Sequence, residues 1–111
     1  MATSVLIVDD HDGFRALARA LLSSEGFEVV GEAGDGASAL RAVDQLGPDV
    51  VLLDVQLPDL DGFEVAARLA ADEAPPAVVL VSTRHASSYR RRLAETSVRG
   101  LRTQGAGTLS M

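Results

Sequence analysis

The sequence predicts an α/β fold in which helices cover both faces of a parallel sheet. Short apolar runs alternate with segments whose apolar residues recur at helical spacing, in the order β-α-β-α-β-α-β. The runs are continuously apolar, as is typical of strands that are buried on both faces. With 111 residues, of which 47% are hydrophobic, the chain is expected to form one domain around one core.

The strands are expected at four places. Three are continuously apolar, and Phe27–Ala33 is less so, which predicts an edge position for it. The three apolar runs are Ser4–Val8, Val50–Asp54 and Ala77–Val81.

Three helices fill the intervals between these strands. The first is expected to end before Gly26 and the second at Gly47-Pro48, because glycine ends helices and proline cannot continue them. The apolar faces are formed by Phe14, Leu17, Ala18, Leu21 and Leu22, then by Ala39, Leu40, Val43 and Leu46, then by Phe63, Ala66, Ala67 and Ala70.

The C-terminal part has weaker patterns. Ser87–Glu95 can form a helix, and Val98–Leu101 is expected to form a short fifth strand. Residues 104–111 lack periodicity and are expected to be an irregular tail, so the domain is assigned to residues 1–103. No amphipathic segment suited to a final helix is found.

Composition excludes several classes of protein. A net charge of −6 disfavours direct, sequence-independent binding of nucleic acid, and the lack of cysteine excludes disulfides and thiolate metal sites. No apolar stretch reaches the roughly 18 residues of a membrane span, and no secretory signal is evident. We therefore expect a cytoplasmic protein without a membrane partner.

Acidic residues follow two of the predicted strands directly. Asp9 and Asp10 follow the first strand, Asp54 ends the third, and Ser82 follows the fourth. Ligands of open parallel sheets bind outside the carboxyl ends of the strands, so these side chains are expected to meet. Three neighbouring carboxylates repel one another unless a cation lies between them, and oxygen ligands suit Mg²⁺.

These motifs resemble those of the receiver domain of two-component response regulators. The resemblance is carried by Val5–Asp10, Asp54–Gly62 and Val78–Ser82, in this order and at these spacings. It implies a flavodoxin-like three-layer sandwich with about five strands in the order 2-1-3-4-5, here without the final helix. It also implies a signalling module that is not an enzyme, similar to receivers that precede a helix-turn-helix output domain.

The resemblance implies a role for each acidic residue. Asp54 would accept a phosphoryl group from a sensor histidine kinase. Asp10, Asp54 and the backbone carbonyl of Gln56 would bind Mg²⁺, and Asp9 would hold a metal-bound water. Ser82 would contact the phosphoryl group, and Thr83 would lie at its entrance.

The sequence departs from the family pattern at one charged position. Receivers carry a lysine at the end of strand five, whereas all ten basic residues here are arginine and Gln104 aligns with that position. Glutamine provides a hydrogen bond without charge, which is a weaker interaction with a phosphoryl group. A damaged, frameshifted or truncated 3′ end of the gene would explain both this and the missing helix, and the nucleotide sequence would test it.

Two other functions are consistent with the residues. The chain could be a degenerate receiver that binds a partner without phosphorylation, with residues 84–102 contacting a second copy or an output protein. Alternatively, Asp10 and Asp12 resemble the nucleophile and the acid/base of haloacid-dehalogenase-type phosphatases, although that family also needs a lysine.

The same residues can also be explained by structural roles alone. Asp9-Asp10 could cap the first helix, and His11 and His85 are expected to be ordinary loop residues because neither has a partner at ligand spacing.

Overall fold

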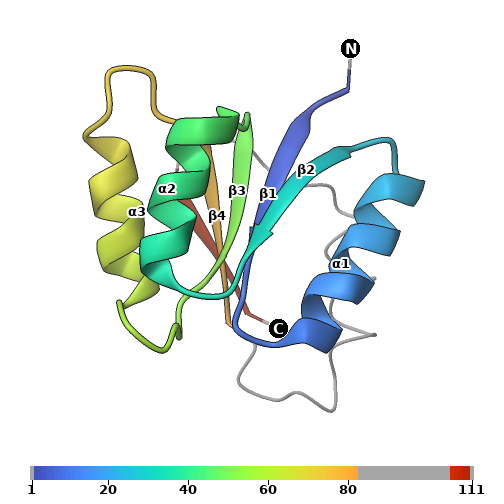
Figure 1. Ribbon diagram of the computed structural model, residues 1–111, viewed down its shortest axis with the longest axis horizontal. Coiled ribbons are helices and arrows are strands. Elements are labelled where there is room, and N and C mark those ends of the chain that lie inside the picture. The colour runs from blue at the N-terminus through green and yellow to red at the C-terminus, as the bar shows by residue number, and fades with distance from the viewer. Residues whose placement is uncertain (1, 83–105, 111) are drawn as a thin grey trace.

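A computed structural model of the chain describes residues 2–82 and 106–110 (Figure 1). Helices and strands alternate along the described chain as the sequence predicts. Their bounds are β1 Ser4–Val8, α1 Asp12–Ser24, β2 Glu28–Ala33, α2 Gly36–Leu46, β3 Val50–Asp54, α3 Gly62–Ala70, β4 Ala77–Ser82 and β5 Ala106–Ser110.

The described strands form one parallel sheet in the order β2-β1-β3-β4-β5. From β1 the chain first adds β2 on one side and then crosses over to add β3 on the other side. The strand order therefore reverses between β1 and β3, which are hydrogen-bonded neighbours. This arrangement confirms the predicted flavodoxin-like α/β fold and the edge position of β2. In such sheets, ligands bind at the carboxyl ends of the two strands where the order reverses.

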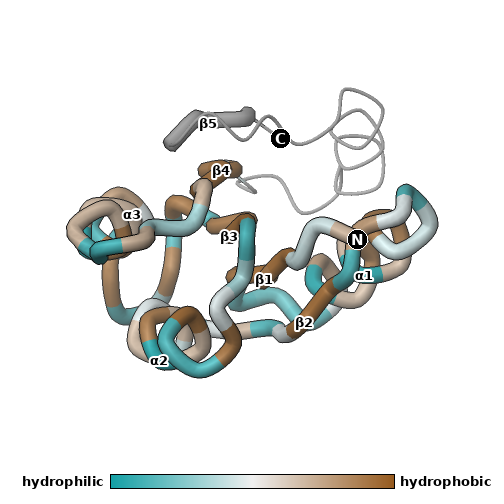
Figure 2. Tube along the Cα trace, turned by 90° about the horizontal axis from the view of Figure 1, so that it is seen from above, coloured by the Kyte–Doolittle hydropathy of each residue, from teal (hydrophilic) through white to brown (hydrophobic). Residues whose placement is uncertain are grey.

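The sheet separates two hydrophobic clusters. Alternate residues of each strand face opposite sides, so in β1 Leu6 contributes to the cluster under α2 and α3, whereas Ile7 contributes to the cluster under α1. Figure 2 shows hydrophobic strands with α1 on one side of the sheet and α2 and α3 on the other. The layers therefore follow from strands that are apolar on both faces.

Local signals set the helix ends. The carboxylate of Asp35 accepts a hydrogen bond from the backbone N–H of Ser38 at 2.7 Å and caps α2. Gly47 ends the same helix with a φ of 56°, in the left-handed region that glycine adopts without a steric penalty. Gly26 follows α1 with a φ of 91°. Both glycines confirm the predicted helix ends.

A strand lies near the C-terminal end of the described chain. The structure places β5 at Ala106–Ser110, within the segment 104–111 that was expected to be irregular, and it pairs with β4 from Val78↔Ala106 to Ser82↔Ser110. Val98–Leu101 and Ser87–Glu95 lie outside the described residues. Backbone pairing along the edge of β4 satisfies N–H and C=O groups whatever the side-chain periodicity, so tertiary context outweighs the weak local pattern.

Among the described residues, no helix combines the length and the apolar character that crossing a membrane requires.

Candidate functional site at the carboxyl ends of the strands

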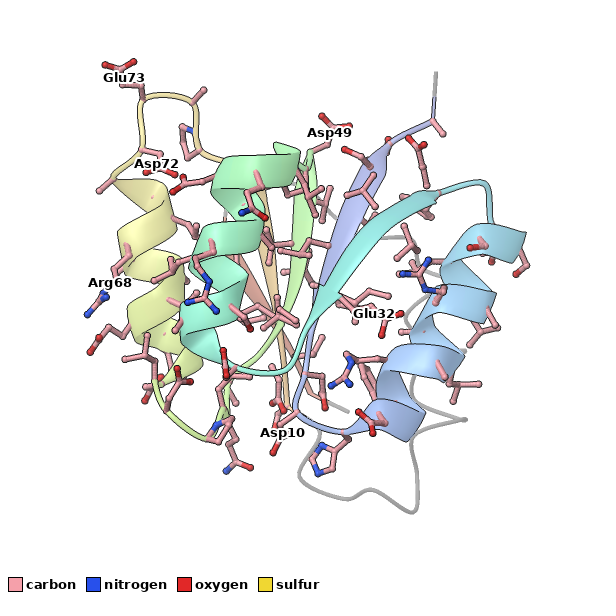
Figure 3. The ribbon with its side chains drawn as sticks, viewed as in Figure 1. Asp10, Glu32, Asp49, Arg68, Asp72 and Glu73 are labelled. Atoms are coloured by element: carbon pink, nitrogen blue, oxygen red, sulfur yellow. The ribbon has the colours of Figure 1, made fainter. Side chains whose placement is uncertain are left out.

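The acidic residues meet where β1 and β3 end. Val8 is paired with Leu53, so Asp9 and Asp54 are the next residues on two neighbouring strands. Figure 3 shows Asp10 at the lower end of the sheet, whereas Asp49 lies at the upper, amino-terminal end of β3. Parallel pairing of two strands thus brings together carboxylates that lie 45 residues apart in the chain.

Four side chains form a compact cluster at this end. Ligand atoms of Asp9, Asp10, His11 and Asp54 all lie within 4.8 Å of one another. The side chains of Asp9 and Asp54 are 0% and 1% exposed, whereas Asp10 and His11 are exposed to solvent. The cluster is therefore buried at its base and open at its mouth.

Backbone groups hold the two buried carboxylates. Asp9 Oδ1 accepts a hydrogen bond from the backbone N–H of His11 at 2.8 Å, and Asp54 Oδ1 accepts one from the N–H of Gln56 at 3.1 Å. The N–H of Val55 donates to the carbonyl of Val81 at 2.9 Å, which ties the end of β3 to β4. Each carboxylate is thus oriented by the backbone that follows it.

His11 is the residue that the sequence interpretation missed. Its Nδ1 lies 2.9 Å from Asp9 Oδ1 and 3.0 Å from Asp10 Oδ1. The hydrogen bond to Asp9 raises the pKa of His11, partial burial opposes this, and the negative charges of Asp9, Asp10 and Asp54 raise it further. Its position directly after Asp9-Asp10 was the signal in the sequence that could have indicated this role. His11 was expected to be a loop residue because it has no partner at ligand spacing.

The donor set suits a hard divalent cation. Three carboxylates converge from two strand ends, and two of them are buried, which is unfavourable for ionised groups without a compensating positive charge. Carboxylate and carbonyl oxygens are the ligands that Mg²⁺ prefers. The residues present therefore fit the Mg²⁺ that the sequence predicts here.

The loop that follows Asp54 is tightly packed against it. Gly62 N–H donates to the carbonyl of Val55 at 3.0 Å, and a Cβ atom at Gly62 would lie 2.4 Å from the carbonyl oxygen of Asp54. Gln56 and Asp61 form a bridge across the same loop. Only glycine permits so close an approach of the start of α3 to the end of β3.

Asp59 connects this loop to helix α2. Its carboxylate accepts hydrogen bonds from the backbone N–H groups of Gly36 at 2.7 Å and Ala37 at 3.0 Å. These bonds hold the pKa of Asp59 below its usual range. A negative charge at the first turn of α2 also complements the helix dipole.

The remaining predicted residues have different outcomes. Ser82 ends β4, one residue beyond the Asp54↔Val81 pair, and is half-buried at the same end of the sheet. Gln56 follows Asp54 in the loop with its side chain exposed. Thr83 and Gln104 lie outside the described residues, as does the segment 84–102.

The fold is that of a receiver domain. A family model of the response regulator receiver domain matches residues 5–101, and the chain belongs to this family. The expectation drawn from the three sequence motifs is thereby confirmed.

Similar proteins include two curated relatives and one solved structure. Response regulator GacA of Pseudomonas aeruginosa is 38% identical over 108 residues, which are 96% of this chain and 50% of GacA. BvgA of Bordetella pertussis is 38% identical over 100 residues, 90% of this chain and 48% of BvgA. The signal receiver domain of NarL from Mycobacterium tuberculosis has a TM-score of 0.71 and 36% identity, covering 98% of this chain and 82% of that one.

The chain spans about half the length of the curated relatives that it matches.

Proposed function

We propose that the chain is a phosphoacceptor of a two-component system, with Asp54 as the residue that is modified. A sensor histidine kinase would be the donor, and Mg²⁺ the required cation. The observation that carries this proposal is the convergence of Asp54 with Asp9 and Asp10 at adjoining strand ends. A cytoplasmic location is part of the same proposal.

The transfer is a nucleophilic substitution at phosphorus. A carboxylate oxygen of Asp54 forms a bond to the phosphorus of a phosphohistidine, and the P–N bond breaks, leaving the electron pair on the imidazole. Bound Mg²⁺ would supply positive charge that stabilises the transferring phosphoryl oxygens. Asp10, Asp54 and the Gln56 carbonyl are the proposed direct ligands, and Asp9 would hold a water bound to the cation.

Neighbouring residues of the chain position the Asp54 carboxylate for this reaction. The N–H of Gln56 orients the Asp54 carboxylate, and the packed Gly62 fixes the backbone of Asp54. Ser82 is the proposed hydrogen-bond donor to the new phosphoryl group, because it ends the strand next to β3. Thr83 and Gln104 are also proposed to lie near the phosphoryl group, and this proposal depends on the family resemblance alone.

The alternative function is a degenerate receiver that binds its partner without phosphorylation. The observation that favours it is the complete absence of lysine from the sequence, which removes the charged contact of the family pattern. A neutral glutamine would stabilise the phosphoryl group less. In that case residues 84–102 would be the proposed contact with a second copy or an output protein.

A phosphatase that uses Asp10 and Asp12 is the third candidate. The Asp12 side chain is 93% exposed and pairs with Arg15, and Asp12 does not belong to the cluster around Asp54. No described contact favours this candidate over the other two.

Mass spectrometry after incubation with Mg²⁺ and a small acyl phosphate tests the proposal. We expect a single phosphate adduct that is lost in Asp54→Asn and retained in Asp72→Asn, a variant of an exposed carboxylate away from the cluster. An adduct that persists in Asp54→Asn would move the acceptor to another residue. No adduct in the wild type would favour the degenerate receiver, and steady phosphatase turnover lost only in Asp10→Asn would favour the third candidate.

A further inference from the structure

Arg15 connects the metal-binding turn to the neighbouring strand. Its guanidinium donates to the backbone carbonyl of Asp9 and to the carboxylate of Asp12, and its Nε donates to Glu32 at 3.1 Å. The Arg15 side chain is 17% exposed, so most of it is packed between α1 and β2. Figure 3 shows Glu32 on β2 beside α1.

The contact with Asp9 falls on the peptide group that joins Asp9, the proposed partner of a metal-bound water, to Asp10, a proposed direct ligand. The carbonyl of Asp9 and the N–H and Cα of Asp10 belong to the same planar unit, so fixing the carbonyl fixes the plane from which the Asp10 backbone continues. The N–H of Asp9 already donates to the carbonyl of Ala33 on β2 at 3.0 Å. Arg15 and Glu32 thus add a second tie to the same strand, on the side nearer to Asp10.

We infer that Arg15 is a positioning residue for the Mg²⁺ site, acting through the backbone carbonyl of Asp9. This inference rests on the proposed function, since it concerns the same carboxylates. Arg15 is not a metal ligand and carries the same charge sign as the cation. Its contribution is the orientation of the Asp9–Asp10 peptide, held in place by Glu32.

Arg19 provides a matched control one turn further along α1. Its Nε donates to the other carboxylate oxygen of Glu32 at 2.6 Å, and its second contact is with the Val29 carbonyl, not with Asp9. Replacing either arginine by methionine removes one positive charge and one ion pair with Glu32. Arg15→Met also removes the ion pair with Asp12 and the contact with the Asp9 carbonyl in the metal-binding turn.

The direction in which the Kd for Mg²⁺ changes distinguishes a positioning role of Arg15 from a purely electrostatic one. Removing a positive charge near a cation site by itself favours cation binding. Positioning predicts the opposite, because the loss of groups that orient metal ligands typically weakens metal affinity by about tenfold or more. Arg15→Met should therefore raise the Kd for Mg²⁺ by about tenfold, while Arg19→Met should leave it within about twofold.

The experiment is a titration of the whole chain with Mg²⁺ at constant ionic strength, followed by amide NMR. Unfolding by denaturant without Mg²⁺ is measured in parallel, because a purely structural role would lower stability without separating the two variants in Kd. If Arg15→Met fails to fold, the pair Arg15→Lys and Arg19→Lys replaces it, since lysine keeps the charge but cannot reproduce the branched contacts. The expected result is a higher Kd for Mg²⁺ in the Arg15 variant alone.

Two outcomes would contradict the inference in different ways. A wild-type protein that binds Mg²⁺ while both arginine variants bind it equally well overturns the role of Arg15 alone. A wild-type protein that does not bind Mg²⁺ overturns the proposed function, and this inference with it.

Discussion

At the scale of single residues, the buried carboxylates pose an electrostatic problem. Asp9 and Asp54 lie at the base of the site almost without solvent contact, and ionised groups in such places need hydrogen bonds or opposite charge. Backbone N–H groups provide part of this, and His11 provides a further donor to Asp9. His11 is therefore a partner of the acidic cluster and not a plain loop residue.

The titration of His11 is a direct test of this environment. Without Mg²⁺, we expect the pKa of His11 to lie above its ordinary value of 6.5, because the protonated ring is hydrogen-bonded to Asp9 and faces Asp10 and Asp54. A raised pKa in the folded state means that the stabilisation is complete below about pH 6.5 and is lost as pH rises through the folded value. NMR of the ring protons measures it.

The control for this titration is Asp9→Asn. Asparagine keeps the size of the side chain but removes the main cause of the shift, so the pKa of His11 should fall towards 6.5. A wild-type His11 that titrates at or below 6.5 would contradict the contacts described for the ring.

At the scale of elements, the loop from β3 to α3 is held at both of its ends. Gly62 packs against the backbone of Asp54, and Asp59 caps α2 from outside that helix. The contact with α2 is not local, because Asp59 and Gly36 lie 23 residues apart. The loop that follows the proposed acceptor is therefore supported by contacts with three elements, β3, α2 and α3.

Replacing Gly62 by alanine should disturb this support. The new Cβ would lie 2.4 Å from the Asp54 carbonyl oxygen and 2.6 Å from Val55 Cα, and backbone atoms cannot rotate away. We expect a loss of about 1–3 kcal/mol in the free energy of unfolding, with a displaced Asp54 amide signal and slower phosphorylation. Denaturant unfolding and amide NMR would measure the first two effects.

Gly13 is the matched control for this substitution. It lies in α1, and a Cβ atom added there would have no heavy atom within 4 Å, so Gly13→Ala should stabilise the helix by up to about 1 kcal/mol. Equal effects of the two substitutions would show that helix propensity, and not the close approach to Asp54, governs Gly62.

At the scale of the whole molecule, stability depends on both faces of the sheet. Among the described residues, the buried helical side chains on the α1 side of the sheet are Phe14, Ala18 and Leu22, and Phe14 is fully buried. Since α1 also carries Arg15 and follows the Asp9–Asp10 turn, its packing positions one side of the site. Loss of this packing would affect fold and site together.

Phe14 and Phe63 are the same residue type in helices but differ in burial, so their replacement by alanine tests how burial affects stability. Phe14→Ala should lower the free energy of unfolding by about 3–5 kcal/mol, because it leaves a cavity against the sheet. Phe63, which is 55% exposed, should change it by only about 0.5 kcal/mol when replaced by alanine. Thermal and denaturant unfolding of both variants test this, and similar losses would contradict the described packing of α1.

Much of the fold is readable from the sequence because its causes are local. Three continuous apolar runs and the less apolar run Phe27–Ala33 predicted four strands, and helical periodicity predicted three helices, two of them ended by glycine. Parallel pairing then makes neighbours of the ends of β1 and β3, so the meeting of Asp9, Asp10 and Asp54 was also predictable. The position of β5 at Ala106–Ser110 was not, because its pairing with β4 depends on an available sheet edge, which no local pattern indicates.

The sequence by itself determined the class of fold and the acidic half of the site, since both depend on residue type and spacing along one strand or helix. The tertiary structure alone decided which groups surround those acids. His11 turns back onto Asp9 and Asp10, Arg15 reaches Glu32 across 17 residues, and Asp59 caps a helix 23 residues earlier. The contacts of Arg15 and Asp59 depend on the register of the sheet and on the packing of helices against it, which no local pattern encodes.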